Sequence, residues 1–140
     1  MTDTFVTLHG WLGADVQVRQ AGDAQVVSFR LGCTPRRYSR KSDSWVDGAT
    51  QWYTVNAWRV LGENCRDSLR RGDPVVVHGR LEAQVWVNSA NVEVTSFVVE
   101  ATSVGHDLTR GVSRFAKNPP VAAAPAPAVE PESREEAPAA

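Results

Sequence analysis

The strongest constraint on the fold is a strict alternation of side chains between Val75 and Trp86. Every second residue from Val75 onward is apolar or glycine, whereas most of the residues between them are polar. Successive side chains of a β-strand point to opposite faces of a sheet, so the pattern predicts a strand with one face in a core. That core face is expected to comprise Val75, Val77, Gly79, Leu81, Ala83 and Val85. Trp86 falls on the opposite, polar face.

Other segments also have strand character, and one segment is helical. The predicted strands are Phe5–Gly10 with Val16–Arg19 as its continuation past a bulge at Gly13, Gln25–Tyr38, Gln51–Trp58, and Val92–Val104. Leu61, Cys65 and Leu69 recur every four residues, which predicts a helix that stops at Gly72. The resulting order predicts an all-β fold, a five-stranded OB-fold barrel with one helix between strands three and four.

The composition changes near Asn118. Residues 119–140 contain 6 Pro, 8 Ala and 4 Glu, and a segment with so few large apolar residues is expected to be disordered. Residues 1–118 carry 14 Lys and Arg against 12 Asp and Glu, whereas residues 119–140 carry 1 against 4. We therefore expect a mildly basic barrel domain over residues 1–108, a linker over 109–118 and an acidic Pro/Ala/Glu-rich tail over 119–140.

Several classes of protein have no support in the sequence. The chain lacks a long apolar span, and its first residues, Met1–Thr4, lack the features of a signal peptide, which favours a cytoplasmic location. Cys33 and Cys65 fall on apolar faces and are expected to be buried thiols. The three histidines lie in separate segments, so no metal site is expected. No phosphate-binding loop or nucleophile motif occurs, so neither an enzyme nor a cofactor is predicted.

Aromatic side chains occupy the polar faces of the predicted strands. They are Tyr38, Trp52, Trp58 and Trp86. Any one of them can instead be buried against another subunit or a loop. Four together, interleaved with arginine, favour a surface on which nucleic-acid bases stack. The cations that would contact phosphates are Arg30, Arg36, Arg37, Arg40, Lys41, Arg59 and Arg80, although each alone is more often a solvated surface charge. Trp45, in a polar loop, is either a further base platform or a hairpin staple.

Three motifs carry a resemblance to a known family. They are Val6–Gly13 (VTLHGWLG), Gln51–Val55 (QWYTV) and Leu69–Leu81 (LRRGDPVVVHGRL), with Trp86 at a characteristic spacing after the last. Over about residues 5–108 the chain resembles the bacterial single-stranded DNA-binding protein family. The segment Val104–Leu108 and the excess of Arg over Lys resemble the second, accessory copy of actinobacteria.

The resemblance implies a homotetramer that wraps single-stranded DNA without reading its sequence. It places stacking roles at Tyr38, Trp52, Trp58 and Trp86, and it suggests work in replication, recombination or repair near the nucleoid. Two departures affect this expectation. Glu82–Val85 replace basic residues that often precede the last tryptophan, so affinity is expected to be lower. The tail is acidic without a Pro-Phe tip, so recruitment of repair proteins through it is not expected.

Two other functions remain open at the level of sequence. One is an oligomeric assembly module whose exposed aromatic residues form subunit interfaces and whose nucleic-acid binding is weak or vestigial. The other is an OB-fold subunit of an enzyme that binds RNA or an oligosaccharide, which the lack of any catalytic constellation disfavours.

Overall fold

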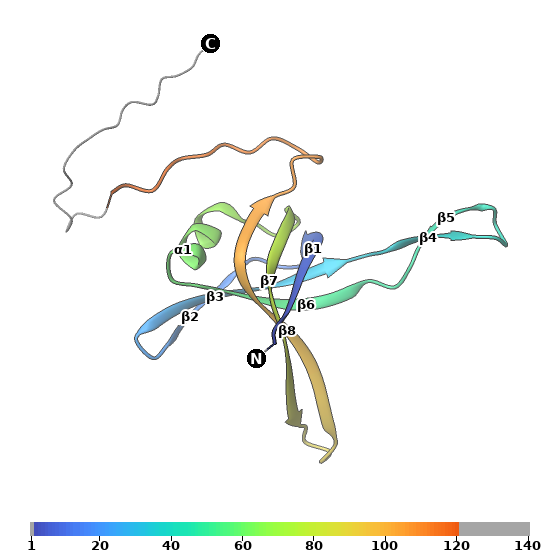
Figure 1. The fold of residues 1–140 in the computed structure, drawn as a ribbon, viewed down its shortest axis with the longest axis horizontal. Coiled ribbons are helices and arrows are strands. Elements are labelled where there is room, and N and C mark those ends of the chain that lie inside the picture. The colour runs from blue at the N-terminus through green and yellow to red at the C-terminus, as the bar shows by residue number, and fades with distance from the viewer. Residues whose placement is uncertain (1, 121–140) are drawn as a thin grey trace, which may run out of the picture.

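Five strands close into a ring in the computed structural model, which describes residues 2–120 (Figure 1). The strands are β1 (Thr4–Leu12), β2 (Gln17–Ala21), β3 (Ala24–Cys33), β4 (Arg36–Ser39), β5 (Ser44–Asp47), β6 (Gln51–Trp58), β7 (Pro74–Val87) and β8 (Glu93–His106). The helix α1 (Arg59–Ser68) lies between β6 and β7. The ring runs β1-β7-β8-β6-β3 and returns to β1 through Trp11 and Leu12, which pair with Gly32 and Leu31. This arrangement confirms the predicted five-stranded all-β fold and the place of its helix.

The core lies inside the ring and under α1. The predicted core residues Val75 and Val77 of β7 are buried there, and Cys65 and Leu69 close the core from the helix side. The buried cluster comprises Leu12, Val27, Phe29, Leu31, Val55, Ala57, Cys65, Leu69, Val75, Val77 and Val99. The helix ends at Ser68, four residues before the predicted stop. Gly72 instead has φ 90° in the turn that leads to β7, a conformation that glycine adopts without strain.

The predicted strand Gln25–Tyr38 is wrong over its last five residues, from Thr34 onward. β3 ends at Cys33 because Pro35 has no backbone N–H to continue the ladder. After Pro35 the chain forms β4, which pairs with β5 in a separate two-stranded sheet. We call this hairpin the arm (residues 36–47), and it projects from the ring in Figure 1. The segment predicted to continue the first strand is also distinct, because β2 pairs with β3 through a turn at Gly22 with φ 65°.

The predicted core positions Ala83 and Val85 are exposed, so that part of the prediction is wrong. β7 and β8 each have 14 residues and extend past the ring, so beyond the Glu82–Val98 pair they pair only with each other. No core lies under this end, and Val85 is 56% exposed. The resulting hairpin extension points away from the ring in Figure 1. Alternation gave the correct face of each residue but not the length over which a core covers that face.

Beyond β8 the chain turns back across the helix. Residues 107–118, which we call the strap, pass over α1, where the amide groups of Asn118 and Asn64 exchange two hydrogen bonds of 2.8 and 3.1 Å. The predicted tail lies almost entirely outside the described residues. Within residues 2–120, α1 is the helix present, and it is too short to cross a membrane.

Candidate nucleic-acid interface

One outward face runs continuously over β3, β6, β8 and β7. Residues that oppose each other in neighbouring strands point to the same side of the sheet. Arg30 opposes Thr54, Asn56 pairs with Glu100, and Glu100 opposes Arg80. The alternation along β6 and β7 then adds the predicted tryptophans to this side. The outward face therefore carries Arg30, Trp52, Trp58, Arg80 and Trp86.

Trp52 is fixed against the backbone of two glycines. A Cβ atom built on Gly13 would lie 2.6 Å from Cζ3 of Trp52, and one on Gly32 would lie 3.0 Å from the same ring. The ring of Trp11 packs edge-on against Trp52, with 6.1 Å between centroids. The indole is thus held in place while 45% of Trp52 remains exposed. An aromatic ring already ordered before binding loses little conformational entropy when a ligand stacks on it.

Arg30 adds a positive charge beside this indole. Its guanidinium carbon lies 5.8 Å from the centroid of the Trp52 ring, and its Nη1 donates a 2.9 Å hydrogen bond to Oγ1 of Thr54. A guanidinium near an indole is attracted by the π-system. The pair presents a flat apolar surface and a cation side by side, which are the two groups that a nucleotide needs for its base and its phosphate.

Trp58 is held by a polar network that links β6 to β8. Its Nε1 donates to Oε1 of Glu100 at 2.7 Å, and Nδ2 of Asn56 donates to Oε2 of the same carboxylate at 3.0 Å. Oγ of Ser28 in turn donates to Oδ1 of Asn56 at 2.7 Å. Asn56 is buried, so these bonds satisfy a side chain that would otherwise be costly to bury. The network fixes the orientation of a second exposed indole on the outward face.

The remaining cations of this region have different surroundings. Arg80 forms an ion pair with Glu82 on the same face, so part of its charge is already balanced. Arg59 follows Trp58 directly and begins α1 with φ 57°, a conformation that is uncommon for a residue other than glycine. Trp86 lies near the end of the hairpin extension, opposite Val94, and is half exposed.

The arm carries the other predicted site residues away from the outward face. Tyr38 opposes Trp45, and their rings pack edge to face with 5.8 Å between centroids. The hydroxyl of Tyr38 donates to Asp43, while Arg36 lies 3.6 Å from the carboxylate of Asp47. The turn at the tip of the arm bears Arg40 and Lys41. Trp45 thus acts as a cross-strand staple for Tyr38, although much of its own ring remains exposed.

The two cysteines, Cys33 and Cys65, contribute no thiolate to the outward face, because burial raises the pKa of both thiols. Cys65 is buried as predicted, and burial raises the pKa of its thiol to about 11. Cys33 is half buried, and burial also raises its pKa above the usual range. Within residues 2–120, no three His, Cys, Asp or Glu side chains come together in a group able to hold a metal ion.

Comparison with known proteins gives the family. The sequence profile of the Single-strand binding protein family matches residues 4–107. This chain belongs to that family. It is 44% identical over 98 residues to "Single-stranded DNA-binding protein 2" of Tropheryma whipplei, a match that spans 69% of this chain and 63% of the relative. It is 37% identical over 115 residues to "Single-stranded DNA-binding protein 1" of Streptomyces coelicolor, which spans 82% of this chain and 73% of the relative.

Solved structures of the single-strand binding protein family share the fold. The crystal structure of the small single-stranded DNA-binding protein from Streptomyces coelicolor superimposes with a TM-score of 0.71 at 37% identity, covering 79% of this chain and all of that chain. The second single-stranded DNA-binding protein of Mycobacterium smegmatis, SSBb, gives a TM-score of 0.61 at 29% identity, covering 83% and 100%. These similarities agree with the predicted resemblance, including its accessory, actinobacterial character.

The predicted site residues of this member of the single-strand binding protein family form two groups. The outward face carries five of them and has Arg59 at its edge, whereas Tyr38, Arg36, Arg40 and Lys41 lie on the arm. Sequence reasoning missed Glu100, Asn56 and Gly13. The only signal for Gly13 was its place in the VTLHGWLG motif, and nothing local to Glu100 marks it as the partner of a tryptophan 42 residues away.

Proposed function

We propose that this protein binds single-stranded DNA by stacking bases on its exposed aromatic residues, without reading the base sequence. The observation that carries the proposal is the fixed and exposed indole of Trp52 on a face that it shares with Trp58 and Trp86. Stacking on an aromatic ring contributes about 1–3 kcal/mol per base and tolerates every base. The names of the relatives, all single-stranded DNA-binding proteins, support the same ligand.

In this proposal the aromatic and cationic residues divide the work. Trp52, Trp58, Trp86 and Tyr38 stack on bases, while the arginines and Lys41 neutralise phosphates and release counterions. The proposed phosphate contacts are Arg30, Arg36, Arg40, Lys41, Arg59 and Arg80. Arg30 is the best placed of them, because its guanidinium already lies beside the ring on which a base would stack.

A fluorescence titration tests the proposal. Intrinsic tryptophan emission is expected to be quenched by oligothymidylate and not by an equivalent duplex, with weaker binding as salt increases. Trp52→Ala, Trp58→Ala and Trp86→Ala are each expected to weaken binding by about 1–3 kcal/mol. Val18→Ala is the control, because Val18 is a partly exposed apolar residue of β2 on the side away from the outward face. Absence of quenching would reject DNA binding and favour the assembly module.

We further propose that the protein assembles as a homotetramer. The reverse side of the hairpin extension exposes Val85, Val87 and Phe97, which have no core beneath them. Contiguous exposed apolar side chains are typical of protein interfaces. Sedimentation at micromolar concentration is expected to give a species larger than the 15.3 kDa chain, and Phe97→Ser is expected to shift it toward smaller species. A monomer for the wild-type protein would reject the assembly.

The proposed biological setting follows from the ligand and the relatives. We infer an accessory role in replication, recombination or repair, in the cytoplasm and at the nucleoid, with residues 1–108 as the DNA-binding domain. Residues 119–140 would act through charge, since their removal changes the formal charge from −1 to +2 per chain. A chain truncated after Asn118 is expected to keep DNA binding and to bind modestly tighter at low salt, which titration of both forms measures.

A further inference from the structure

The strap is hydrogen-bonded to the rest of the fold at two points, and the exposed side chain of Phe115 lies between them. Oγ of Ser113 hydrogen-bonds Nδ1 of His106 at 2.8 Å, and Asn118 exchanges two bonds with Asn64 on α1. Phe115 lies between these anchors and is 90% exposed. A phenylalanine side chain left in water does not gain the stabilisation that burial would give it. A strap that served only as a spacer has no need of an aromatic residue at this place.

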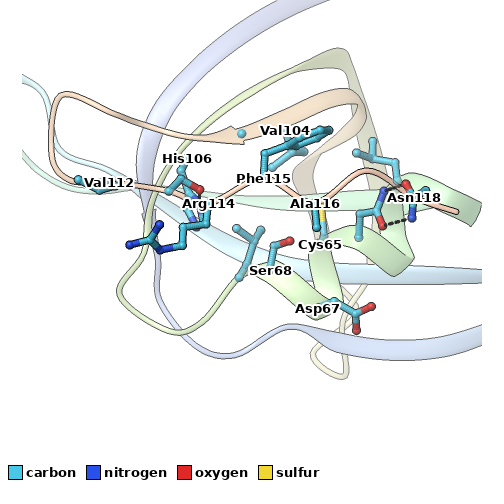
Figure 2. Close-up of a pocket in the computed structure, with 15 residues that line it drawn as sticks. Cys65, Asp67, Ser68, Val104, His106, Val112, Arg114, Phe115, Ala116 and Asn118 are labelled. Atoms are coloured by element: carbon cyan, nitrogen blue, oxygen red, sulfur yellow. Dashed lines mark hydrogen bonds between the residues drawn. The ribbon is translucent and has the colours of Figure 1, made fainter. Parts of the chain in front are cut away.

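Beneath this stretch of the strap lies a cavity of about 590 Å³, which Figure 2 shows with the strap along one side. Its apolar lining comes from α1 and β8, through Leu61, Cys65 and Val104. Phe115 lies on its rim, on the strap side. A volume of this size is within the range of small-ligand sites, and it leaves room for a planar group next to an aromatic ring.

The strap is also strongly basic. Arg110, Arg114 and Lys117 lie within eight residues, and no acidic residue occurs between Asp107 and Glu130. In the described part of the chain, none of the three forms an ion pair. The acidic group on the cavity lining, Asp67, is already bonded to Arg66 at 3.0 Å, and that bond lowers the pKa of its carboxyl group. The ligand that fits is therefore an anion with a flat ring.

The strap is also anchored close to the Trp58 end of the outward face. β6 runs from Trp52 to Trp58 and passes directly into α1. Asn64, which anchors the strap, follows Trp58 by six residues, or about 9 Å along a helix axis. β8 pairs in parallel with β6 over Val98–Glu100 and then continues to His106, where the strap begins. A strand of nucleic acid that follows β6 toward α1 therefore reaches the strap next.

We propose that the strap and the cavity beneath it form a second contact for single-stranded DNA, separate from the outward face. Phe115 stacks on one base at the mouth of the cavity, and Arg110, Arg114 and Lys117 hold the phosphates on either side. The proposal rests on the proposed function, because it extends the path of the same ligand beyond Trp58. It assigns a binding role to residues 109–118, for which the sequence suggested only a linker.

Substitution of Phe115 gives the first test, with oligothymidylates of about 8 and about 30 nucleotides as probes, one within and one well above the roughly 4–16 nucleotides that a single OB-fold barrel holds. Phe115→Ala is expected to weaken binding of the longer probe about five-fold or more, and Phe115→Tyr to restore it. The shorter probe, which the outward face can hold alone, is expected to bind both variants as it binds the wild type. Val112→Ala is the control, because Val112 is an equally exposed strap residue on the same cavity without a ring.

Salt dependence and crosslinking give independent readouts. Replacing Arg110, Arg114 and Lys117 with Gln is expected to lower the slope of log K against log salt by about 2 for the longer probe, at about 0.7 for each lost phosphate contact on a single strand. Photocrosslinking of a 5-iodouracil-substituted probe is expected to label Phe115 in addition to residues of the outward face. Equal affinities for Phe115→Ala and wild type, an unchanged salt slope, or labels confined to the outward face and the arm would overturn the second contact. A wild-type protein that binds neither probe would instead reject the proposed function itself.

Discussion

The indole nitrogen of Trp58 donates to one oxygen of Glu100 while the buried amide of Asn56 donates to the other. A carboxylate at this place brings negative charge to a surface that must accept phosphates, which by itself opposes DNA binding. Both of its oxygens accept hydrogen bonds from side chains of β6, however, so Glu100 of β8 orients the tryptophan of the neighbouring strand. The outward face thus depends on an acidic residue for its geometry.

The first prediction distinguishes the hydrogen bond that orients Trp58 from the stacking of its ring on a base. Trp58→Phe keeps an aromatic ring but removes the Nε1 donor that orients it, so binding of oligothymidylate is expected to weaken, though less than in Trp58→Ala. Glu100→Ala leaves Asn56 buried without its acceptor and is expected to lower the free energy of unfolding by about 1–3 kcal/mol. Urea unfolding measures the second effect. Glu93→Ala, at the exposed start of the same strand, is the control, and a loss of stability as large as that of Glu100→Ala would contradict the network.

The contact between Trp52 and Gly13 provides a test of whether the position of the ring matters for binding. Gly13→Ala places a Cβ about where the ring lies, since the built atom is 2.6 Å from Cζ3 of Trp52. The ring must shift, and we expect weaker binding of oligothymidylate by about 1 kcal/mol or more, because a displaced ring loses part of its stacking. Gly111→Ala is the matched control with an oligothymidylate of about 8 nucleotides, which the outward face can hold without the strap, because a Cβ there meets nothing within 4 Å. Equal affinities of the two variants would show that the position of the ring is unimportant.

The arm is expected to contribute charge rather than rigidity. Replacing both Arg40 and Lys41 with Gln removes two cations from the tip of the arm, far from the core, so the melting temperature should not change. If both contact phosphates, the slope of log K against log salt falls by roughly 1.4, at about 0.7 for each contact on a single strand. Titrations at several salt concentrations measure this slope. An unchanged slope would assign Arg40 and Lys41 to bulk solvent.

Cys65 makes stability depend on alkaline pH. Burial raises the pKa of its thiol from 9.0 to about 11, so the folded state favours the neutral thiol. That stabilisation is fully present below pH 9 and is lost as the pH rises through about 11. Wild type is expected to lose up to about 3 kcal/mol more unfolding free energy over this interval than Cys65→Ala. Denaturant unfolding at pH 8 and pH 10.5 measures the difference, and parallel pH profiles would rule out the assignment.

Sequence alternation located the outward face well because it depends only on neighbours along one strand. It placed Trp52, Trp58 and Trp86 on a solvent side, and the structure has them there. Alternation could not show where the core ends, because that depends on how far β1 and β6 pair with β7 and β8. It therefore predicted a buried Val85, which is exposed. One local signal, Pro35, does mark the point where the predicted strand divides into β3 and the arm.

The residues that orient the site were harder to predict for a different reason. Glu100 lies 42 residues from Trp58 in sequence, and the two meet only through the three-residue parallel pairing of β6 with β8. Gly13 and Trp52 come together through the same kind of distant contact. Such contacts follow from topology, and no periodicity along the chain reveals them. The stacking side chains are therefore visible in the sequence, whereas their supports appear only in the folded molecule.

The parallel pairing of β6 with β8 also determines at what stage of chain synthesis the outward face can form. During synthesis Trp52 and Trp58 leave the ribosome more than 40 residues before Glu100, and chain elongation is slow compared with local folding. A nascent chain that stops short of β8 has its tryptophans but lacks the carboxylate that orients Trp58 and the strand that completes the ring. Contacts between such distant segments form late because the intervening loop must first close. The capacity to bind thus arrives together with the finished fold, and incomplete chains do not present an assembled binding face.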